Sequence, residues 1–234
     1  MIDLHCHILA GLDDGPEDVA DSVRMARIAA ADGIKIIVAT PHIRERLTPP
    51  GLIYGQVAAL NARLADEGVA VTVVAGGEVF AMLDPALLGG YTIQGSRYLL
   101  VEFPYTHLPK NAGEILFRFV EQGFWPIISH PERNPSVLRD PELLASLLND
   151  NISAQITADS LAGNFGAQIQ ACSCHLLRQG LVSFLASDGH SPESRRPVLS
   201  TALKIARKIL GREKADRLVQ DNPAAVLADA PLEQ

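Results

Sequence analysis

Residues 33–42, GIKIIVATPH, decide the fold, because a continuous apolar run rich in β-branched residues ends just before a histidine. Such a run predicts a strand buried on both faces, as strands are in parallel sheets. The same pattern recurs along the chain. Further strands are predicted at 69–75, 98–103, 125–129, 152–157 and 181–186.

Segments of helical periodicity separate these strands. The first follows Asp13-Asp14-Gly15-Pro16 and stops at Gly33. Repeated strand and helix units predict an α/β fold with right-handed crossovers, as a barrel or as an open doubly wound sheet. Residues 48–51 and 221–223 are predicted loops. Other helices are predicted at 54–66, 111–122, 141–148, 166–179, 194–210 and 212–219.

The composition fits one soluble domain. The chain has 234 residues, 47% of them apolar, which is enough for a sizeable core. A net charge of −7 without a basic stripe argues against nucleic acid as a partner. No apolar run reaches the ~20 residues that cross a bilayer, so membrane insertion is not expected. We predict one domain over 1–228 and a flexible tail over 229–234.

The cysteines and the first residues predict a cytoplasmic location. Three cysteines without framework spacing indicate a reduced protein. A signal peptide would need a basic start and an apolar stretch, whereas Asp3 and His5 follow the first methionine closely.

Polar residues gather where the predicted strands end. The opening Asp3-Leu4-His5-Cys6-His7 places two imidazoles on one face of a strand. In a barrel all carboxyl ends of the strands meet at one mouth, and this favours a barrel over an open sheet. The candidate metal ligands are His5, His7, Asp14, His42, Glu78, Glu102, His130, Asp188 and His190.

This set of imidazoles and carboxylates suits Mn²⁺, Fe²⁺ or Zn²⁺ rather than a closed, thiolate-rich structural zinc site. Nine ligands are too many for one ion, so shared carboxylates could bridge two or three. Taken singly, each residue would be read as a cap or a surface group. Their recurrence at strand ends indicates a metal centre.

Arginines after two of these ligands indicate a phosphate site. Arg133 follows His130, and Arg195 and Arg196 follow His190, so they could project over the same mouth. An arginine fork binds phosphate oxygens in pairs. The alternative for each is a surface salt bridge.

A second phosphatase pattern is misleading. Cys172 and Arg178 have the spacing of the C-x5-R core of cysteine-dependent tyrosine phosphatases. That core needs a loop whose backbone N–H groups wrap a phosphate, whereas residues 166–179 have helical composition. We therefore assign this segment, with His175, to a helix.

Together the motifs resemble the polymerase and histidinol phosphatase (PHP) superfamily and, more narrowly, its bacterial manganese-dependent protein-tyrosine phosphatases of capsule and exopolysaccharide synthesis. The resemblance runs from residue 2 to about residue 197. It rests on Asp3-Leu-His-Cys-His7 with Asp13-Asp14-Gly15, Ala39-Thr-Pro-His42, Gly76-Gly-Glu78, Leu100-Val-Glu102, His130-Pro-Glu-Arg133 and Ser187-Asp188-Gly-His190.

The resemblance implies a distorted (β/α)7 TIM-like barrel with two or three divalent ions, manganese first and iron, zinc or cobalt as alternatives. It implies one ion at His5, His7, Glu78 and Asp188, a second at Glu78, Glu102 and His130, and a third at Asp14, His42 and His190. Arg133 and Arg195, with Arg196 close behind, would hold the phosphate. The family pattern has a basic residue followed by prolines here and Asn after the histidine, whereas this chain has Ser191 and Arg195-Arg196-Pro197.

The expected function is metal-assisted hydrolysis of a phosphomonoester. The resemblance implies phosphotyrosine in the tail of a tyrosine autokinase as the substrate, and it is compatible with homo-oligomers. One alternative is a phosphatase of histidinol phosphate or another small phosphoester, and a polymerase-associated exonuclease fits the acidic charge less well. The alternative from another class is a non-catalytic, metal-binding regulatory module.

Overall fold

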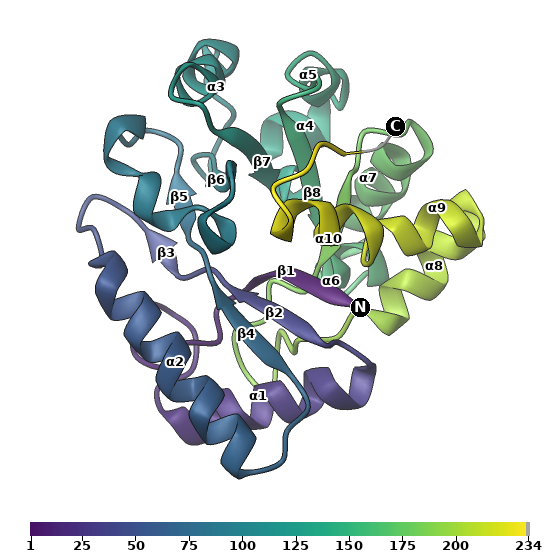
Figure 1. Ribbon diagram of the computed structural model, residues 1–234. Helices are drawn as coiled ribbons and strands as arrows, with labels where there is room; N and C mark the ends of the chain where they lie inside the picture. The colour runs from purple at the N-terminus through teal and green to yellow at the C-terminus, as the bar shows by residue number, and fades with distance from the viewer. Residues whose placement is uncertain (233–234) are drawn as a thin grey trace.

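The computed structural model describes residues 1–232, and its strands form a ring enclosed by helices (Figure 1). Every pair of neighbouring strands in the two sheets is parallel. The first sheet has the order β1 (Ile2–Cys6), β2 (Ile36–Ala39), β4 (Thr72–Ala75). The second has the order β3 (His42–Ile43), β5 (Glu78–Phe80), β6 (Tyr98–Glu102), β7 (Trp125–Ser129), β8 (Ser153–Thr157), β9 (Phe184–Ala186).

Two bends join the sheets on one side. β2 continues into β3, and β4 continues into β5 through Gly76 and Gly77. A Cβ atom on Gly76 would lie 2.9 Å from a methyl of Val38, and one on Gly77 would lie 2.9 Å from the Ile43 side chain. Only glycine therefore allows the two bent strands to approach so closely.

β1 and β9 close the ring on the other side. Cys6 pairs with Gly189 in a parallel bridge, and the Asp188 N–H donates to the His5 carbonyl at 2.8 Å. The buried Asp3 carboxylate accepts the Ser187 N–H at 2.9 Å. Counting each bent strand once, the described residues form the predicted distorted (β/α)7 barrel, which is confirmed.

The helices lie outside the ring, apart from α10, which crosses one of its ends (Figure 1). Asp18 caps the first helix by accepting the Asp21 N–H at 2.9 Å, and Gly33 ends it with φ 90°. The α-helices are α1 (Val19–Asp32), α2 (Pro50–Asp66), α3 (Ala112–Glu121), α4 (Pro135–Arg139), α5 (Glu142–Ala145), α6 (Ala158–Ala162), α7 (Ala167–Arg178), α8 (Ser200–Leu210), α9 (Arg212–Arg217) and α10 (Asp221–Leu227). Short 3₁₀ turns are η1 (Pro85–Leu87), η2 (Gly89–Tyr91), η3 (Ile93–Gly95) and η4 (Pro131–Arg133).

Some predicted boundaries are wrong. α2 begins at Pro50, inside the predicted loop, because proline suits the first turn of a helix. α10 runs through the predicted loop 221–223 for the same reason, with Pro223 in its first turn. α8 begins at Ser200 rather than at residue 194, because the distant Asp32 carboxylate accepts the Ser200 N–H at 2.9 Å and caps it.

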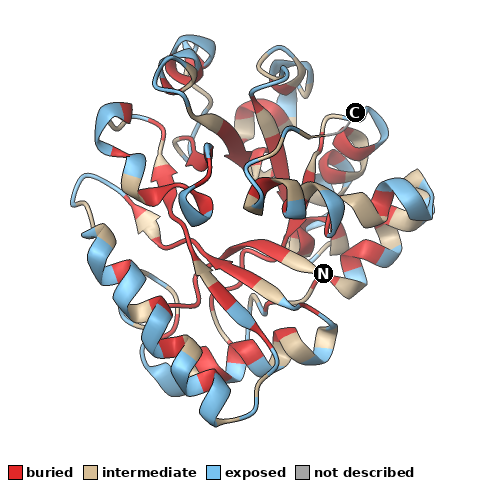
Figure 2. Cartoon of the chain, in the orientation of Figure 1, coloured by how far each residue is buried: buried red, intermediate tan, exposed pale blue. Residues whose placement is uncertain are grey.

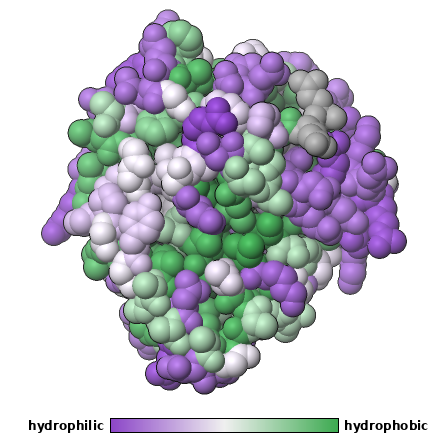
Figure 3. All heavy atoms as spheres, viewed as in Figure 1, coloured by the Kyte–Doolittle hydropathy of each residue, from purple (hydrophilic) through white to green (hydrophobic). Residues whose placement is uncertain are grey.

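The core has two layers, and Figure 2 shows buried strands inside helices whose outer faces are exposed. The outer layer packs strands against helices. The inner layer fills the barrel with Leu4, Val38, Leu100, Ile127 and Phe184, and with Val226 of α10. Figure 3 shows apolar side chains in the middle of this face and hydrophilic ones over α8 and α9 at its right edge. The end of the barrel at which the strands begin is thus filled, and their carboxyl ends remain for a site.

The chain after α10 is bonded to the start of β6. The Asp229 carboxylate accepts the Arg97 N–H at 2.8 Å, and the Ala230 carbonyl accepts the Tyr98 hydroxyl at 2.8 Å. Of the predicted tail, Glu233 and Gln234 lie outside the described residues. Among the described residues, no helix has both the length and the apolar character needed to cross a membrane.

Candidate metal centre

All nine predicted ligands meet at the carboxyl ends of the strands. Each has a ligand atom in at least one group whose members lie within 4.8 Å of one another. β1 carries His5 and leads to His7, β3 and β5 begin with His42 and Glu78, β6 ends with Glu102, β7 leads to His130, β9 leads to Asp188 and His190, and Asp14 precedes α1.

Four groups overlap at this mouth. They are His7, Asp14, His42 and His190; His5, His130 and Asp188; His5, His7 and Glu78; and His42, Glu78 and Glu102. Four residues, His5, His7, His42 and Glu78, belong to two groups each. Of these only Glu78 is a carboxylate with two ligand oxygens, in line with the bridging role that the resemblance implies. Such sharing suits several ions held side by side.

Register in β1 allows both histidines to face inward. Leu4 belongs to the inner core and Cys6 to the outer one, and the pairing with β2 is irregular between Asp3 and Cys6. A bulge of this kind resets the alternation of side chains. His5 and His7 then point to the mouth, while Cys6 faces the helices.

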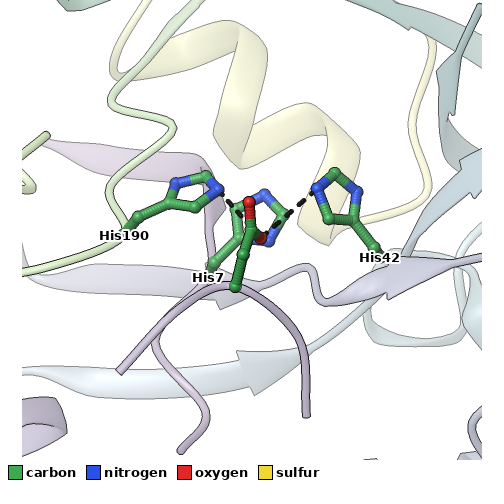
Figure 4. Close-up of side chains that lie close together, drawn as sticks. His7, His42 and His190 are labelled. Atoms are coloured by element: carbon green, nitrogen blue, oxygen red, sulfur yellow. Dashed lines mark ion pairs between the residues drawn. The ribbon is translucent and has the colours of Figure 1, made fainter. Parts of the chain in front are cut away.

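Three imidazoles form the open corner of the centre, and Figure 4 shows His7, His42 and His190 turned toward one another. Asp14 Oδ1 lies 3.5 Å from His42 Nε2 and 3.4 Å from His190 Nε2. The Asp14 side chain is 61% exposed, so this corner faces solvent.

Glu78 occupies the buried middle. Its Oε1 lies 2.9 Å from His130 Nε2, and its Oε2 lies 2.9 Å from His42 Nδ1. Burial acts to raise the pKa of Glu78, but His5 and His130 oppose it and hold the pKa well below its usual range. The carboxylate therefore stays ionised, as a metal ligand must be.

Outer partners fix the ring orientations. Asp13 Oδ2 lies 2.6 Å from His7 Nδ1, and Gln155 Oε1 lies 2.8 Å from His5 Nδ1. His190 Nδ1 lies 2.8 Å from the Asp188 carbonyl. Each hydrogen bond engages Nδ1 and leaves Nε2 free to bind a metal ion, the arrangement usual around metal-binding histidines. The residues thus fit a centre of divalent ions.

The Asp13 and His7 pair is strongly polarised. Burial opposes charge on both, yet each holds the other ionised: the pKa of Asp13 falls to about 2 and that of His7 rises to about 10. Burial, with Arg133 nearby, lowers the pKa of His130 to about 4. Burial and His7 lower that of His190 to about 3. At neutral pH the metal-free protein therefore has a protonated His7 and neutral His130 and His190.

Three residues of this site were not predicted from the sequence. Asp13 stands beside a predicted ligand in Asp13-Asp14-Gly15, and Gln155 is a fully buried polar residue in an apolar strand. Arg44 follows His42 and donates Nη2 to Glu102 Oε2 at 2.9 Å. Two signals in the sequence could have identified two of them: Gln155 is polar within a buried strand, and Arg44 is basic and follows a candidate ligand.

Two of the three predicted arginines share one carboxylate. Arg133 and Arg195 each donate Nη2 to Asp188 Oδ2 at 2.6 Å, whereas Arg196 is exposed. Both Nε atoms are buried without a hydrogen-bond partner among the described residues. Both guanidinium groups therefore keep donors that no described residue satisfies.

Comparisons with known proteins agree on one family. The family model for capsular polysaccharide synthesis, CpsB/CapC, matches residues 1–228. The tyrosine-protein phosphatase YwqE of Bacillus subtilis strain 168 is 37% identical over 219 residues, covering 91% of this chain and 86% of that protein. The putative tyrosine-protein phosphatase CapC of Staphylococcus aureus is 32% identical over 218 residues, covering 89% and 84%.

Solved structures agree as well. One from work on YwqE of Bacillus subtilis and CpsB of Streptococcus pneumoniae, described as metal-dependent tyrosine phosphatases, has a TM-score of 0.92 at 34% identity and covers 100% of both chains. Organophosphorus hydrolase from Deinococcus radiodurans has a TM-score of 0.58 at 14% identity, covering 97% and 92%, and shares the fold alone. The chain belongs to the CpsB/CapC family of capsular polysaccharide synthesis.

Proposed function

We propose that this chain is a metal-dependent phosphatase of phosphotyrosine. The observation that carries the proposal is the convergence of nine metal-ligating side chains beside Arg133 and Arg195. Relatives named tyrosine-protein phosphatases support the choice of phosphotyrosine.

The residues divide the work of phosphoryl transfer. Bound divalent ions would lower the pKa of water and compensate phosphate charge. Arg133 and Arg195 would orient the phosphate through guanidinium donors that Asp188 does not use, and so would stabilise its equatorial oxygens in the transition state. Glu78 would keep neighbouring ions together, because its two oxygens face different imidazoles.

A cysteine mechanism is not supported. Cys172 lies within α7, where burial raises its pKa to about 11. Burial raises the pKa of Cys6 well above its ordinary value, and its thiol lies 3.5 Å from the Gly189 carbonyl. Neither thiol would be ionised near neutral pH, so direct hydrolysis is the simpler chemistry.

The finer parts of the proposal concern ions, partner and place. We propose two or three ions, manganese first, because the donor set has carboxylates and imidazoles but no thiolate. The proposed substrate is the phosphotyrosine tail of a tyrosine autokinase of capsule or exopolysaccharide synthesis. A cytoplasmic location fits Cys6, Cys172 and Cys174, which are free thiols.

One assay separates the alternatives. Manganese-loaded protein should hydrolyse a phosphotyrosyl peptide with a higher kcat/KM than histidinol phosphate or a phosphoseryl peptide. A chelator or His7→Ala should abolish turnover, whereas His175→Ala on α7 should leave it unchanged. A higher kcat/KM for histidinol phosphate would instead indicate a phosphatase of small phosphoesters. Turnover that survives chelation would contradict the metal chemistry, and partner binding without turnover would indicate a regulatory module.

A further inference from the structure

Phe165 lies beside the predicted phosphate site without a role in the core. Its side chain is half-buried, yet it belongs to neither hydrophobic cluster of the described residues. Its ring centroid lies 5.4 Å from Arg133 Cζ, within the range of a cation–π contact. The ring therefore packs on a guanidinium that faces the mouth.

The loop that carries Phe165 is held firmly. Gly163 and Gly166 have φ 91° and 96°, values that other residues rarely adopt, and the Gly166 N–H donates to the Gly163 carbonyl at 3.0 Å. Between them, Asn164 donates its N–H to the Asp159 carbonyl at 2.9 Å and its Nδ2 to Asp159 Oδ1 at 2.7 Å. These bonds hold the backbone on both sides of Phe165.

Two spaces near the arginines differ in whether they can hold a substrate ring. Phe165 lines a cavity of about 510 Å³ together with Arg195 and Arg196. Arg133 itself lines a second space, with Phe103 and Tyr105, of about 20 Å³. The smaller space has room for little more than a water molecule. Of these two spaces, only the cavity beside Phe165 and Arg195 has room for an aryl ring.

We propose that Phe165 determines specificity by packing against the aromatic ring of phosphotyrosine while Arg133 and Arg195 hold the phosphate. This inference rests on the proposed role of the two arginines. Aromatic pairs are favourable when their centroids lie 4.5–7 Å apart, and an alkyl phosphate offers no such partner. Phe165 thus favours aryl over alkyl phosphoesters.

Two inhibitors isolate the ring. Phenylphosphonate and methylphosphonate share an anionic head that resists hydrolysis and differ in the aromatic group. In the metal-loaded enzyme, Phe165→Leu and Phe165→Ala should weaken inhibition by phenylphosphonate about 5- to 10-fold, the size of one aromatic pair. Inhibition by methylphosphonate should change less than about 2-fold. Phe117→Ala, which truncates an exposed ring on α3, should change neither constant.

Three outcomes would overturn the inference. The first is equal weakening of both inhibitors by the Phe165 variants, which would reduce Phe165 to an orienting residue for Arg133. The second is no change for either inhibitor in these variants. The third is a loss of selectivity for the aromatic ring in Tyr105→Ala instead. Arg133→Ala tests the underlying phosphate site separately, because it should weaken methylphosphonate. An unchanged constant there would overturn the arginine role, whereas a failure confined to the Phe165 variants would leave that role intact.

Discussion

Asp13 accepts a hydrogen bond from His7 across 2.6 Å, and the same Oδ2 atom accepts the backbone N–H of His42 at 2.9 Å. Its other oxygen accepts the Gly15 N–H at 2.9 Å. One carboxylate that is not itself in a ligand group thereby ties together β1, β3 and the loop of Asp14. It sets the spacing of three ligands in the open corner.

Asp13→Asn should weaken metal binding at this corner. Asparagine keeps the shape but loses the charge that holds His7 in place, and loss of such an outer partner costs about 10- to 100-fold in metal affinity. Titration of the metal-free variant with Mn²⁺, followed by metal analysis, measures the effect. Asp18→Asn is the matched control, because Asn caps a helix as well as Asp does. Equal affinity in both variants would contradict the positioning role.

Metal binding should release protons near pH 8. The pKa of His7 is raised to about 10 in the metal-free protein, so its ring is protonated there, and a metal at Nε2 must displace one proton. His130 and His190, with pKa values of about 4 and 3, are already neutral and release none. Release from His7 should fade as the pH rises through 10.

Calorimetry checks this proton count. Heats of Mn²⁺ binding at pH 8, measured in two buffers of different ionisation enthalpy, should report release of at least about one proton. Asp13→Asn should lower the count, because the partner that raises the pKa of His7 has lost its charge. Identical heats in both buffers for the unmodified protein would refute the prediction.

The convergence of most candidate ligands was predictable because two regular geometries combine. A buried strand shows in the sequence as an apolar run, and a barrel brings all carboxyl ends to one mouth. A residue such as Glu102 is therefore placed by counting from the end of its run. Among the candidate ligands, Asp14 is the exception, because it lies in the loop between β1 and α1.

Contacts between distant segments were not predictable. Gln155 orients His5 from a strand that follows 150 residues later, and Asp32 caps α8 across 168 residues. The sequence does not show that Arg195, rather than the adjacent Arg196, contacts Asp188. That contact goes with a left-handed backbone at Arg195, where φ is 45°. No local sequence pattern predicts such contacts between distant segments, because they depend on how the whole barrel closes.

Metal stoichiometry should distinguish Glu78 from Asp14. Glu78 belongs to two ligand groups and Asp14 to one, so Glu78→Ala should remove more bound metal than Asp14→Ala. Metal analysis after gel filtration gives the ratio of metal to protein. Glu114→Ala on α3, outside the centre, should keep the full content. Equal loss in the first two variants would argue against a bridging carboxylate.

Gly15→Ala should damage the metal corner through backbone displacement alone. A Cβ atom at this position would lie 2.2 Å from the His7 carbonyl oxygen and 3.0 Å from Asp13 Oδ1, so the loop of Asp14 must move. We expect a loss of about 1–3 kcal/mol in the free energy of unfolding of the metal-free protein, in the range of overpacking. Denaturant titration measures that loss, and Mn²⁺ titration should show weaker binding.

Gly51→Ala is the control for this last prediction. It makes the same substitution in α2, where a Cβ would meet no atom within 4 Å. Alanine favours helix over glycine by about 1 kcal/mol, so this variant should keep or gain stability and bind metal normally. If Gly15→Ala behaved in the same way, the loop would have room to adapt, and the tight packing of His7 on Gly15 would not define the corner.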